Sequence, residues 1–373
     1  MKVLHFYKTF FPETYGGVEQ VIDQLAQGMK KFGVESEVLT ITKQKELKSS
    51  VVNGYHVYRS KSSLSLASTE FSVSAFKDFY YLAQEADIIH YHFPNPFADV
   101  LHFFLNIKKP TVVTYHSDIV KQKNLLKFYK PLMNKFLKNV DCIVATSDNY
   151  VNSSDLLEGF KEKTKVIPIG INKASYPLID ANKLTYWENK LGKNFFLFVG
   201  VLRYYKGLYS LLDAAKGAEY KVVIIGSGGI EQELQDYVKE HNIDNVIFLG
   251  AVSNDDKVAI MQLCLSVVLP SHLRSEAFGI SLLEGAMYGK PLVSCEIGTG
   301  TTFINQDGVT GLVAEPENSK SLREKMDHIW NNPITAHTMG ENALVRYNEL
   351  FTADRMVGEY YGVYEELVRD NKK

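Results

Sequence analysis

Two glutamates with seven residues between them, Glu276 and Glu284, flank a Phe-Gly turn in the stretch SEAFGISLLEGAMYGKP (residues 275–291). The apolar pattern after the turn predicts a helix, and the backbone N–H groups at a helix start attract anions. Glu276 would lie just outside this helix, where it could accept hydrogen bonds from a polyol. Glu284, about one and a half turns inside, could reach a ribose diol. Because acidic residues near a helix start are favourable for dipole reasons alone, the pair needs support from other loops.

A second loop, VLRYYKGL, follows the predicted strand FFLFVG and carries Arg203 and Lys206. Two cations at one strand end suit a diphosphate, because Arg offers a planar fork of donors and Lys a compact charge. Ordinary surface solubility is the alternative. The loop after VVIIG contains Gly226, but its sequence SGGIEQEL lacks the full G-x-G-x-x-G pattern, so its signal is weak.

The first half of the chain offers a glycine loop and three histidines. Gly16 and Gly17 in PETYGGVEQ would let the backbone approach a ligand at the start of a helix, although a plain strand-to-helix turn has the same composition. His90, His92 and His116 each stand at the end of a predicted strand. A lone histidine is more often structural than catalytic, but three at adjacent strand ends favour a site, above all for His116.

The composition excludes several other classes of protein. The chain has 373 residues, 45% of them hydrophobic, and a net charge of -2, which argues against nucleic acid as a partner. Neither H-E-x-x-H nor D-x-D occurs, so no dedicated metal site is expected. The start of the chain resembles a strand rather than a signal peptide, and no run approaches the length of a membrane span. Three scattered cysteines without a C-x-x-C spacing predict buried, reduced thiols and a cytoplasmic location; they are Cys142, Cys264 and Cys295.

Short β-rich runs alternate with helix-length segments, which is typical of parallel sheets covered by helices. The length predicts two doubly wound α/β domains, residues 1–170 and 194–352, joined by a linker at 171–193 where the periodicity lapses. Residues 353–373 are expected to form a helix that packs back on the first domain. Strands are predicted at residues 2–8, 35–41, 54–60, 86–92, 110–116, 141–147 and 165–170, and then at 195–202, 220–226, 245–250, 265–271, 290–296 and 310–315.

One segment, residues 121–139, carries six lysines and no acidic residue, with apolar residues at near-helical spacing. Pro131 is expected to kink or split this helix. An ordinary domain helix with a solvated lysine face is one interpretation. The other is a basic amphipathic surface, residues 121–138, that rests on anionic lipid.

Taken in order, these motifs resemble the retaining glycosyltransferases of family 4. The resemblance covers nearly the whole chain, through FFPETYGGVEQ, TYHSD, VIPIGIN, FVGVLRYYKGL, GSGGIEQEL and, most specifically, SEAFGISLLEGAMYGKPLVSCEIGTGTTFINQDGVTGLV. It implies the GT-B fold, in which two Rossmann-like domains face each other across a cleft. It further implies that a nucleotide-diphosphate sugar is the co-substrate, held mainly by the C-terminal domain, and that an acceptor is held by the N-terminal one. No other cofactor and no metal are implied.

The resemblance also implies roles for individual residues. Glu276 would contact the hydroxyls of the donor sugar and Glu284 the ribose, while Arg203 and Lys206 would neutralise the leaving diphosphate. His116 would lie near the donor sugar. The other residues implied to bind the donor are Gly16, Gly17, Gly200, Gly226, Phe278, Gly279 and Ile280, and those assigned to the acceptor are Tyr15, His92 and Asp118.

Two positions depart from the family pattern. Val201 stands where the family usually has an arginine, so the arginine comes two residues later, at Arg203. Asn172 replaces the aspartate that usually ends the P-x-G-x-D motif. The departures weaken the roles expected at these two places.

The expected reaction is the metal-independent, retaining transfer of a hexose. A front-face mechanism is expected, in which the leaving phosphate itself takes the proton of the acceptor hydroxyl. The stretches YHFPNPFADVL and CEIGTGTTF are similar to those of bacterial enzymes that build O-antigen and other surface polysaccharides. This similarity favours mannose from GDP-mannose and a lipid-linked saccharide acceptor, with the enzyme peripheral on the inner face of the cytoplasmic membrane. The alternatives are a UDP-sugar-dependent transferase, a sugar-nucleotide epimerase and a non-catalytic nucleotide-sugar-binding protein.

Overall fold

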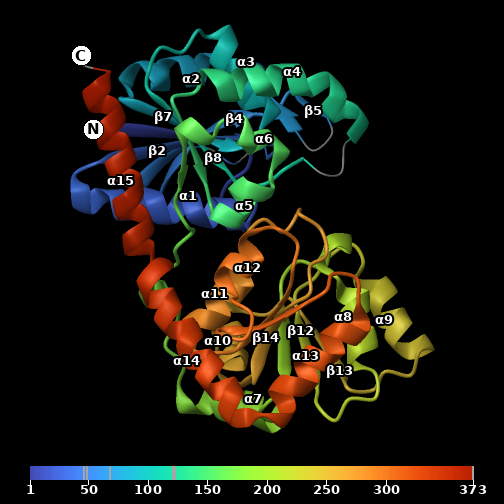
Figure 1. Cartoon of the computed structure of the whole chain (residues 1–373). Coiled ribbons are helices and arrows are strands. Elements are labelled where there is room, and N and C mark those ends of the chain that lie inside the picture. Colours follow the sequence, from blue (N-terminus) through green and yellow to red (C-terminus); the bar gives the residue numbers. More distant parts are fainter. Residues whose placement is uncertain (45–46, 48, 67–68, 120–122, 372–373) are drawn as a thin grey trace. The chain divides into compact units, whose positions relative to one another are not determined.

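The chain forms two compact units in the computed structural model, which describes residues 1–371 except 45–46, 48, 67–68 and 120–122 (Figure 1). Unit 1 comprises Met1–Gly170 together with Ala353–Lys373, and unit 2 comprises Ile171–Thr352. Figure 1 colours unit 1 from blue to green, with the C-terminal helix in red, and unit 2 from green to orange-red.

Unit 1 is built on an eight-stranded sheet of order β10-β9-β8-β7-β1-β2-β4-β3. All neighbours are parallel except β3 and β4. The chain winds outward from β1 on one side and then from β7 on the other, so the topological switch point lies between these two strands. The strands are β1 (Lys2–Phe6), β2 (Glu35–Thr42), β3 (Ser50–Val52), β4 (Tyr55–Lys61), β7 (Ile88–Phe93), β8 (Thr111–Tyr115), β9 (Cys142–Ala145) and β10 (Thr164–Val166), with a separate hairpin of β5 (Leu64–Leu66) and β6 (Thr69–Phe71).

The helices of unit 1 include one from the end of the chain. Helix α15 (Ala353–Asp370) lies against α1 (Gly17–Gly28). Just after α1, the ring of Phe32 stacks on that of Tyr361 in α15, with 4.3 Å between the ring centroids. The remaining helices are η1 (Met29–Phe32), α2 (Val73–Glu85), α3 (Pro96–Phe104), α4 (Lys123–Asn139), α5 (Asp148–Ser153), α6 (Asp155–Glu158) and η2 (Lys161–Lys163).

Helix α4 contains most of the lysine-rich segment and turns its apolar side inward. It is continuous through Pro131 rather than split. Met133 and Phe136 are buried in the unit, and the Tyr129 hydroxyl donates to Asp99 on α3. Residues 121 and 122 of the segment lie outside the described residues. The apolar side of α4 is therefore occupied by the protein core, and the outward side is mostly basic but includes the exposed Phe128.

Unit 2 contains a six-stranded, fully parallel sheet of order β13-β12-β11-β14-β15-β16. Its switch point lies between β11 and β14. The strands are β11 (Phe196–Val199), β12 (Val222–Ile225), β13 (Val246–Gly250), β14 (Ser266–Leu269), β15 (Leu292–Cys295) and β16 (Gly311–Ala314). The helices are η3 (Lys173–Ser175), α7 (Ala181–Leu191), η4 (Tyr204–Lys206), α8 (Leu208–Ala215), α9 (Glu231–Glu240), α10 (Asn254–Leu263), α11 (Ile280–Met287), α12 (Gly300–Ile304), α13 (Ser319–Asn331) and α14 (Pro333–Leu350).

The segment 171–193, expected to be a linker, is part of unit 2. It contains α7, which packs against α10 and buries Trp187. The indole Nε1 of Trp187 donates to Asp256 at 2.9 Å, and Asp180 caps the helix by accepting from the backbone N–H of Lys183. The linker prediction was wrong because the apolar residues of α7 are few and widely spaced among polar ones.

Each strand predicted from the sequence is present, because β-branched runs bounded by turns are a strong local signal. The three strands that were not predicted, β3, β5 and β6, have three residues each. The three cysteines are buried and free, as expected. Within the described residues, the structure contains no helix both long and apolar enough to cross a membrane.

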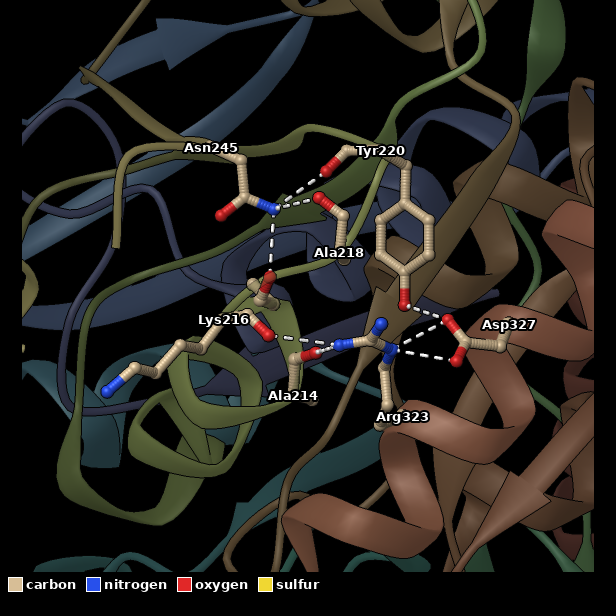
Figure 2. A network of polar contacts seen from close by, with 8 residues as sticks. Ala214, Lys216, Ala218, Tyr220, Asn245, Arg323 and Asp327 are labelled. Carbon is tan, nitrogen blue, oxygen red and sulfur yellow. Dashed lines mark hydrogen bonds and ion pairs between the residues drawn. The ribbon is translucent and has the colours of Figure 1, made fainter. Parts of the chain in front are cut away.

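A polar network closes the C-terminal end of α8, whose other end follows the Lys206 loop (Figure 2). The Asn245 side-chain nitrogen donates to the carbonyls of Ala215 and Tyr220, at 2.8 Å each, and to that of Ala218. Arg323 binds the carbonyls of Ala214 and Lys216 and forms an ion pair with Asp327, which also accepts from the Tyr220 hydroxyl. The last carbonyls of a helix have no partner within it, so this network supplies the bonds that α8 needs to end at this place.

We expect Asn245→Ala to lower the free energy of unfolding of unit 2 by about 1–3 kcal/mol, because it removes the side-chain donor to the carbonyls of Ala215, Ala218 and Tyr220. Both tryptophans, Trp187 and Trp330, lie in unit 2, so urea titration followed by tryptophan fluorescence measures this unit. Asn331→Ala, on an exposed residue of α13, is the control. Equal midpoints for the two variants would contradict the role of the network.

Candidate functional site

The loops that carry the predicted site of unit 2 leave two neighbouring strands. The loop with Arg203 and Lys206 follows β11, and the loop with Glu276 follows β14. β11 and β14 pair with each other at the switch point of the sheet. In open α/β sheets, ligands bind beyond the carboxyl ends of the strands at this point. The topology therefore brings together two loops that are far apart in the sequence.

Glu276 and Lys206 form a largely buried ion pair. Lys206 Nζ binds Glu276 Oε2, and the side chains are only 12% and 11% exposed. The Ser271 hydroxyl donates to the same oxygen at 3.2 Å. Removing a carboxylate from water is costly unless it is paired, so the lysine and the serine make the buried position of Glu276 tolerable.

Two glycines allow the loops to approach this closely. Gly207 has φ +68°, and a Cβ there would lie 1.9 Å from the carbonyl oxygen of Pro270, at the end of β14. Gly226 has φ +132°, and its Cβ would lie 2.0 Å from the carbonyl oxygen of Gly200, at the end of β11. Any larger residue at these positions would push the loops after β11, β12 and β14 apart. Gly200 and Gly226 thus shape the site through their backbones.

Glu284 forms a second pair on the next helix. Its Oε1 accepts from Lys257 Nζ on α10 at 2.5 Å and from the Tyr176 hydroxyl at 2.9 Å. Burial together with the adjacent Glu284 charge raises the pKa of Tyr176 far above its usual value. Tyr176 therefore stays protonated and serves only as a donor toward Glu284.

Each of the two glutamates keeps one oxygen available. Among the described residues, no side chain or backbone group donates to Oε1 of Glu276 or to Oε2 of Glu284. A carboxylate oxygen held in place on one side and open on the other accepts hydrogen bonds from hydroxyl groups. The pair can therefore hold two different hydroxyl-bearing parts of one ligand.

The turn before α11 presents its backbone rather than its side chains. Phe278 is 4% exposed and packs edge-to-face against Phe351, at 6.1 Å between ring centroids. Gly279 has φ +100°, and Ile280 is the first residue of α11. The N–H groups that begin this helix have no partner within it and favour an anion.

Arg203 does not join this group of contacts. Its side chain is exposed, and it forms no side-chain hydrogen bond or ion pair with another described residue. Its carbonyl accepts from the Lys206 N–H at 3.0 Å, so it lies in the same tight turn. The structure thus gives Lys206 a fixed position and leaves Arg203 unanchored.

The predicted residues of unit 1 gather at the ends of β1, β7 and β8. Gly16 and Gly17 begin α1, where the buried Glu19 accepts from Thr9 at 2.9 Å and from Thr14 at 2.5 Å. Tyr15 is 72% exposed and stacks on Phe11, so it lies at the surface beside the glycines.

The histidines of this edge are in direct contact. His92 Nδ1 lies 3.0 Å from His116 Nε2, and both rings are buried. Asp118 accepts from the hydroxyl of Tyr115 at 2.7 Å and, through its backbone N–H, donates to the hydroxyl of Tyr150. Asp118 is thereby bound to the strand edge rather than directed into solvent.

Several residues of these sites were missed by the sequence analysis. Lys257 and Tyr176 are 27 and 108 residues from Glu284, and nothing in their local sequence marks them. Ser271 stands at the end of a predicted strand, which was a usable signal. Glu19 was visible as an acid two residues after the glycine pair. His5, at the centre of the first strand, had the polar side chain that is unusual in a buried run.

Two family profiles match the chain. The one described as Glycosyltransferase Family 4 covers residues 15–175, and the one described as Glycosyl transferases group 1 covers residues 185–346. The D-rhamnosyltransferase WbpZ of Pseudomonas aeruginosa is 53% identical over 95% of this chain and 93% of its own. O-antigen chain mannosyltransferase C of Escherichia coli is 49% identical over 99% of both chains.

Solved structures with low identity share the fold. Sucrose-phosphate synthase of Thermosynechococcus elongatus superposes with a TM-score of 0.81 at 19% identity, covering 99% of both chains. HepE of Anabaena in complex with UDP gives a TM-score of 0.76 at 19% identity, covering 98% of this chain and 100% of the other. The chain therefore has the GT-B fold and belongs to family 4 of the glycosyltransferases.

Proposed function

We propose that this glycosyltransferase moves mannose from GDP-mannose to a lipid-linked saccharide, with retention of configuration and without a metal ion, in the synthesis of a bacterial surface polysaccharide. One observation carries the proposal. At the switch point of unit 2, each of two buried glutamates is held by a lysine and keeps one oxygen open. Such a site suits a sugar and a ribose joined by a diphosphate.

Lys206 supplies the charge that the reaction needs in this proposal. Departure of a nucleoside diphosphate develops negative charge on the phosphates, and preorganised donors stabilise that charge. The ammonium group of Lys206 has three protons, and Glu276 and its neighbours hold it in place. The N–H groups at the start of α11 add a second donor. Arg203, exposed and unanchored, would act only by folding over the bound ligand.

The arrangement of carboxylates supports the front-face mechanism. Retaining glycosidases use two carboxyl groups about 5 Å apart that flank the scissile bond. Here each carboxylate is tied to a different lysine, Glu276 to Lys206 and Glu284 to Lys257. They are placed as binding groups, so the leaving phosphate is the base that takes the proton of the acceptor hydroxyl.

The names of the relatives support the choice of sugar and acceptor. The Escherichia coli relative is named a mannosyltransferase of the O-antigen chain, and the Pseudomonas aeruginosa relative a D-rhamnosyltransferase. In unit 1, Tyr15 and Asp118 are the proposed acceptor residues, and Gly16, Gly17 and His116 the proposed donor contacts. His92, which was also expected to contact the acceptor, is 0% exposed and binds His116 instead. A UDP-sugar donor is the second candidate, because HepE was solved with UDP.

Helix α4 is the proposed contact with the inner face of the cytoplasmic membrane. Its outward face, here called the lysine face, consists of Lys127, Phe128, Lys130, Lys135 and Lys138, all exposed. Phe128 is 85% exposed. Basic side chains near a large apolar one suit a surface of anionic lipid.

Lys206→Ala is expected to lower kcat about 10²–10³-fold, the usual loss for one preorganised donor. Transfer from GDP-mannose to an acceptor extract measures the effect. Lys216→Ala, which removes an exposed lysine after α8, is the matched control, and tryptophan fluorescence checks that unit 2 is folded. Turnover near the wild-type value in the Lys206 variant would exclude the front-face mechanism as written.

Glu284→Ala is expected to abolish the thermal stabilisation that the donor gives. At a hundredfold excess over its Kd, a ligand adds about 2.7 kcal/mol, which raises Tm measurably. GDP-, UDP- and ADP-sugars are compared without metal on the wild type, on this variant and on Glu240→Ala, an exposed control on α9. A shift with UDP-sugars alone would replace the donor proposed here, and equal shifts in all three proteins would remove Glu284 from the site.

Replacing Lys127 and Lys130 by Ala is expected to weaken binding to anionic vesicles about thirtyfold, since each lysine near such a surface contributes about 1 kcal/mol. Co-sedimentation with vesicles of phosphatidylglycerol and phosphatidylcholine measures this, and pure phosphatidylcholine shows the charge dependence. Lys216→Ala with Lys239→Ala, both exposed in unit 2, is the control. An equal loss in the two double variants would exclude a specific role for the lysine face.

A further inference from the structure

Three histidine rings form a chain that runs from the interior of unit 1 to the edge of its sheet. His5 on β1 lies with its Nδ1 3.2 Å from Nε2 of His92 on β7. His92 in turn lies with its Nδ1 3.0 Å from Nε2 of His116, directly after β8. His5 and His92 are 0% exposed and His116 is 8% exposed, so only the His116 end approaches the surface.

Burial keeps these rings neutral. It lowers the pKa of His5 and of His116 to about 3, and it lowers the pKa of His92 well below its usual value, together with the neighbouring histidines. A neutral imidazole carries one proton on one of its two nitrogens. Each contact in the chain therefore needs one nitrogen that donates and one that accepts.

Only two arrangements of protons satisfy both contacts. In the outward arrangement, His5 donates to His92, His92 donates to His116, and His116 keeps its proton on Nδ1. In the inward arrangement every proton is reversed, so His116 donates from Nε2 and its Nδ1 is bare. Both arrangements satisfy the same two contacts, so what distinguishes them energetically is the group that is left at each end of the chain.

The inner end selects between them. Nε2 of His5 is buried and has no hydrogen-bond partner among the described residues. In the inward arrangement this nitrogen would carry an orphaned N–H, and buried N–H groups without an acceptor are rarer than under-satisfied acceptors. The outward arrangement leaves a bare nitrogen there and places a donor at the other end.

We infer that His92 and His5 are positioning residues that fix His116 as the neutral tautomer with its proton on Nδ1. His116 then presents a donor, and it recognises an oxygen acceptor on the nucleotide-sugar. The inference rests on the proposed function, which places His116 at the donor. It adds that Nδ1 of His116 is the hydrogen-bond donor, and that the buried residues His5 and His92 fix this tautomer.

The neighbouring ring of His90 does not compete for this chain. Its Nδ1 lies 2.6 Å from the Tyr364 hydroxyl and its Nε2 2.7 Å from that of Thr114, so both nitrogens are engaged. His5, His90 and His92 lie close enough together to hold a metal ion. However, both nitrogens of His90 already form hydrogen bonds, and so do the nitrogens of His5 and His92 that face each other. These contacts favour a hydrogen-bonded chain over a metal site.

The test uses a matched pair of substitutions that differ only in hydrogen-bond direction. In His92→Asn the amide can donate to His116 Nε2, as the native ring does. In His92→Asp the carboxylate only accepts, which forces the proton of His116 onto Nε2. The protein is labelled with [15N]histidine, its signals are recorded at alkaline pH, and His116→Gln identifies the signal of His116.

We expect the Nδ1–H tautomer of His116 in the wild type and in His92→Asn, and the Nε2–H tautomer in His92→Asp. The new carboxylate should also raise the pKa of His116 into the neutral range, where the wild-type ring does not titrate. A wild type with the proton on Nε2, or an Asp variant with an unchanged tautomer, would overturn the inference. Thermal denaturation of both variants shows whether they are folded, and the wild-type spectrum alone already tests the predicted tautomer.

Activity then separates the inference from the function on which it rests. In His92→Asp we expect kcat to fall about ten- to hundredfold with the Kd of free GDP unchanged. In His92→Asn, which keeps a donor toward His116, we expect a smaller fall in kcat than in His92→Asp. If the tautomer of His116 reverses in His92→Asp and kcat does not change, His116 has no role at the donor. The proposed contact between His116 and the nucleotide-sugar then fails, and so does the positioning role inferred for His5 and His92. If His116→Gln lowers kcat but the wild-type tautomer is Nε2–H, the site stands and the inference is wrong.

Discussion

A carboxylate taken out of water must recover its lost hydration from the protein, and this constraint shapes the site of unit 2. Glu276 and Glu284 are 9% and 5% exposed. In each of them, one carboxylate oxygen accepts hydrogen bonds from a lysine and from a hydroxyl group. The partners come from four segments: the loop after β11, the loop after β14, helix α10 and the turn before α7. Because the partners use one oxygen of each carboxylate, the other remains for a ligand. The same contacts that make burial tolerable thus prepare the site.

The parallel sheet makes such convergence possible. All strands of unit 2 end at one edge of the sheet. The direction of winding reverses between β11 and β14, so the loops that follow these two strands leave a space in which charged groups from both loops can meet. Precision comes from the backbone. Gly207 and Gly226 let the loops touch carbonyl groups of neighbouring strands, and the network of Asn245 and Arg323 anchors the far end of α8. Lys206 is therefore held through elements on both sides of it.

Unit 1 solves the burial of polar groups in a different way. Its histidines lose their charge instead of pairing with acids, and hydrogen bonds between neutral rings replace the ion pairs of unit 2. A chain of neutral rings has no net charge, but its hydrogen bonds all point one way, and the unpartnered nitrogen of His5 sets that direction. This contrast fits a transferase in which one unit stabilises the charge of a leaving group and the other orients neutral hydroxyls.

The sequence by itself determined the strands other than β3, β5 and β6, the location of the loops at strand ends, and the family, because β-branched runs, glycines and compact motifs are local features. It also placed Lys206 and Glu276 in those loops and Glu284 inside the helix that follows. Only the tertiary structure decided which groups meet them: Lys257 and Tyr176 at Glu284, and His5 behind His92. It also decided that the apolar side of α4 is buried and that 171–193 contains a packed helix. The reason is physical: local pattern follows from neighbouring residues, whereas the partner of a buried polar group is chosen by the packing of segments that are distant in the chain.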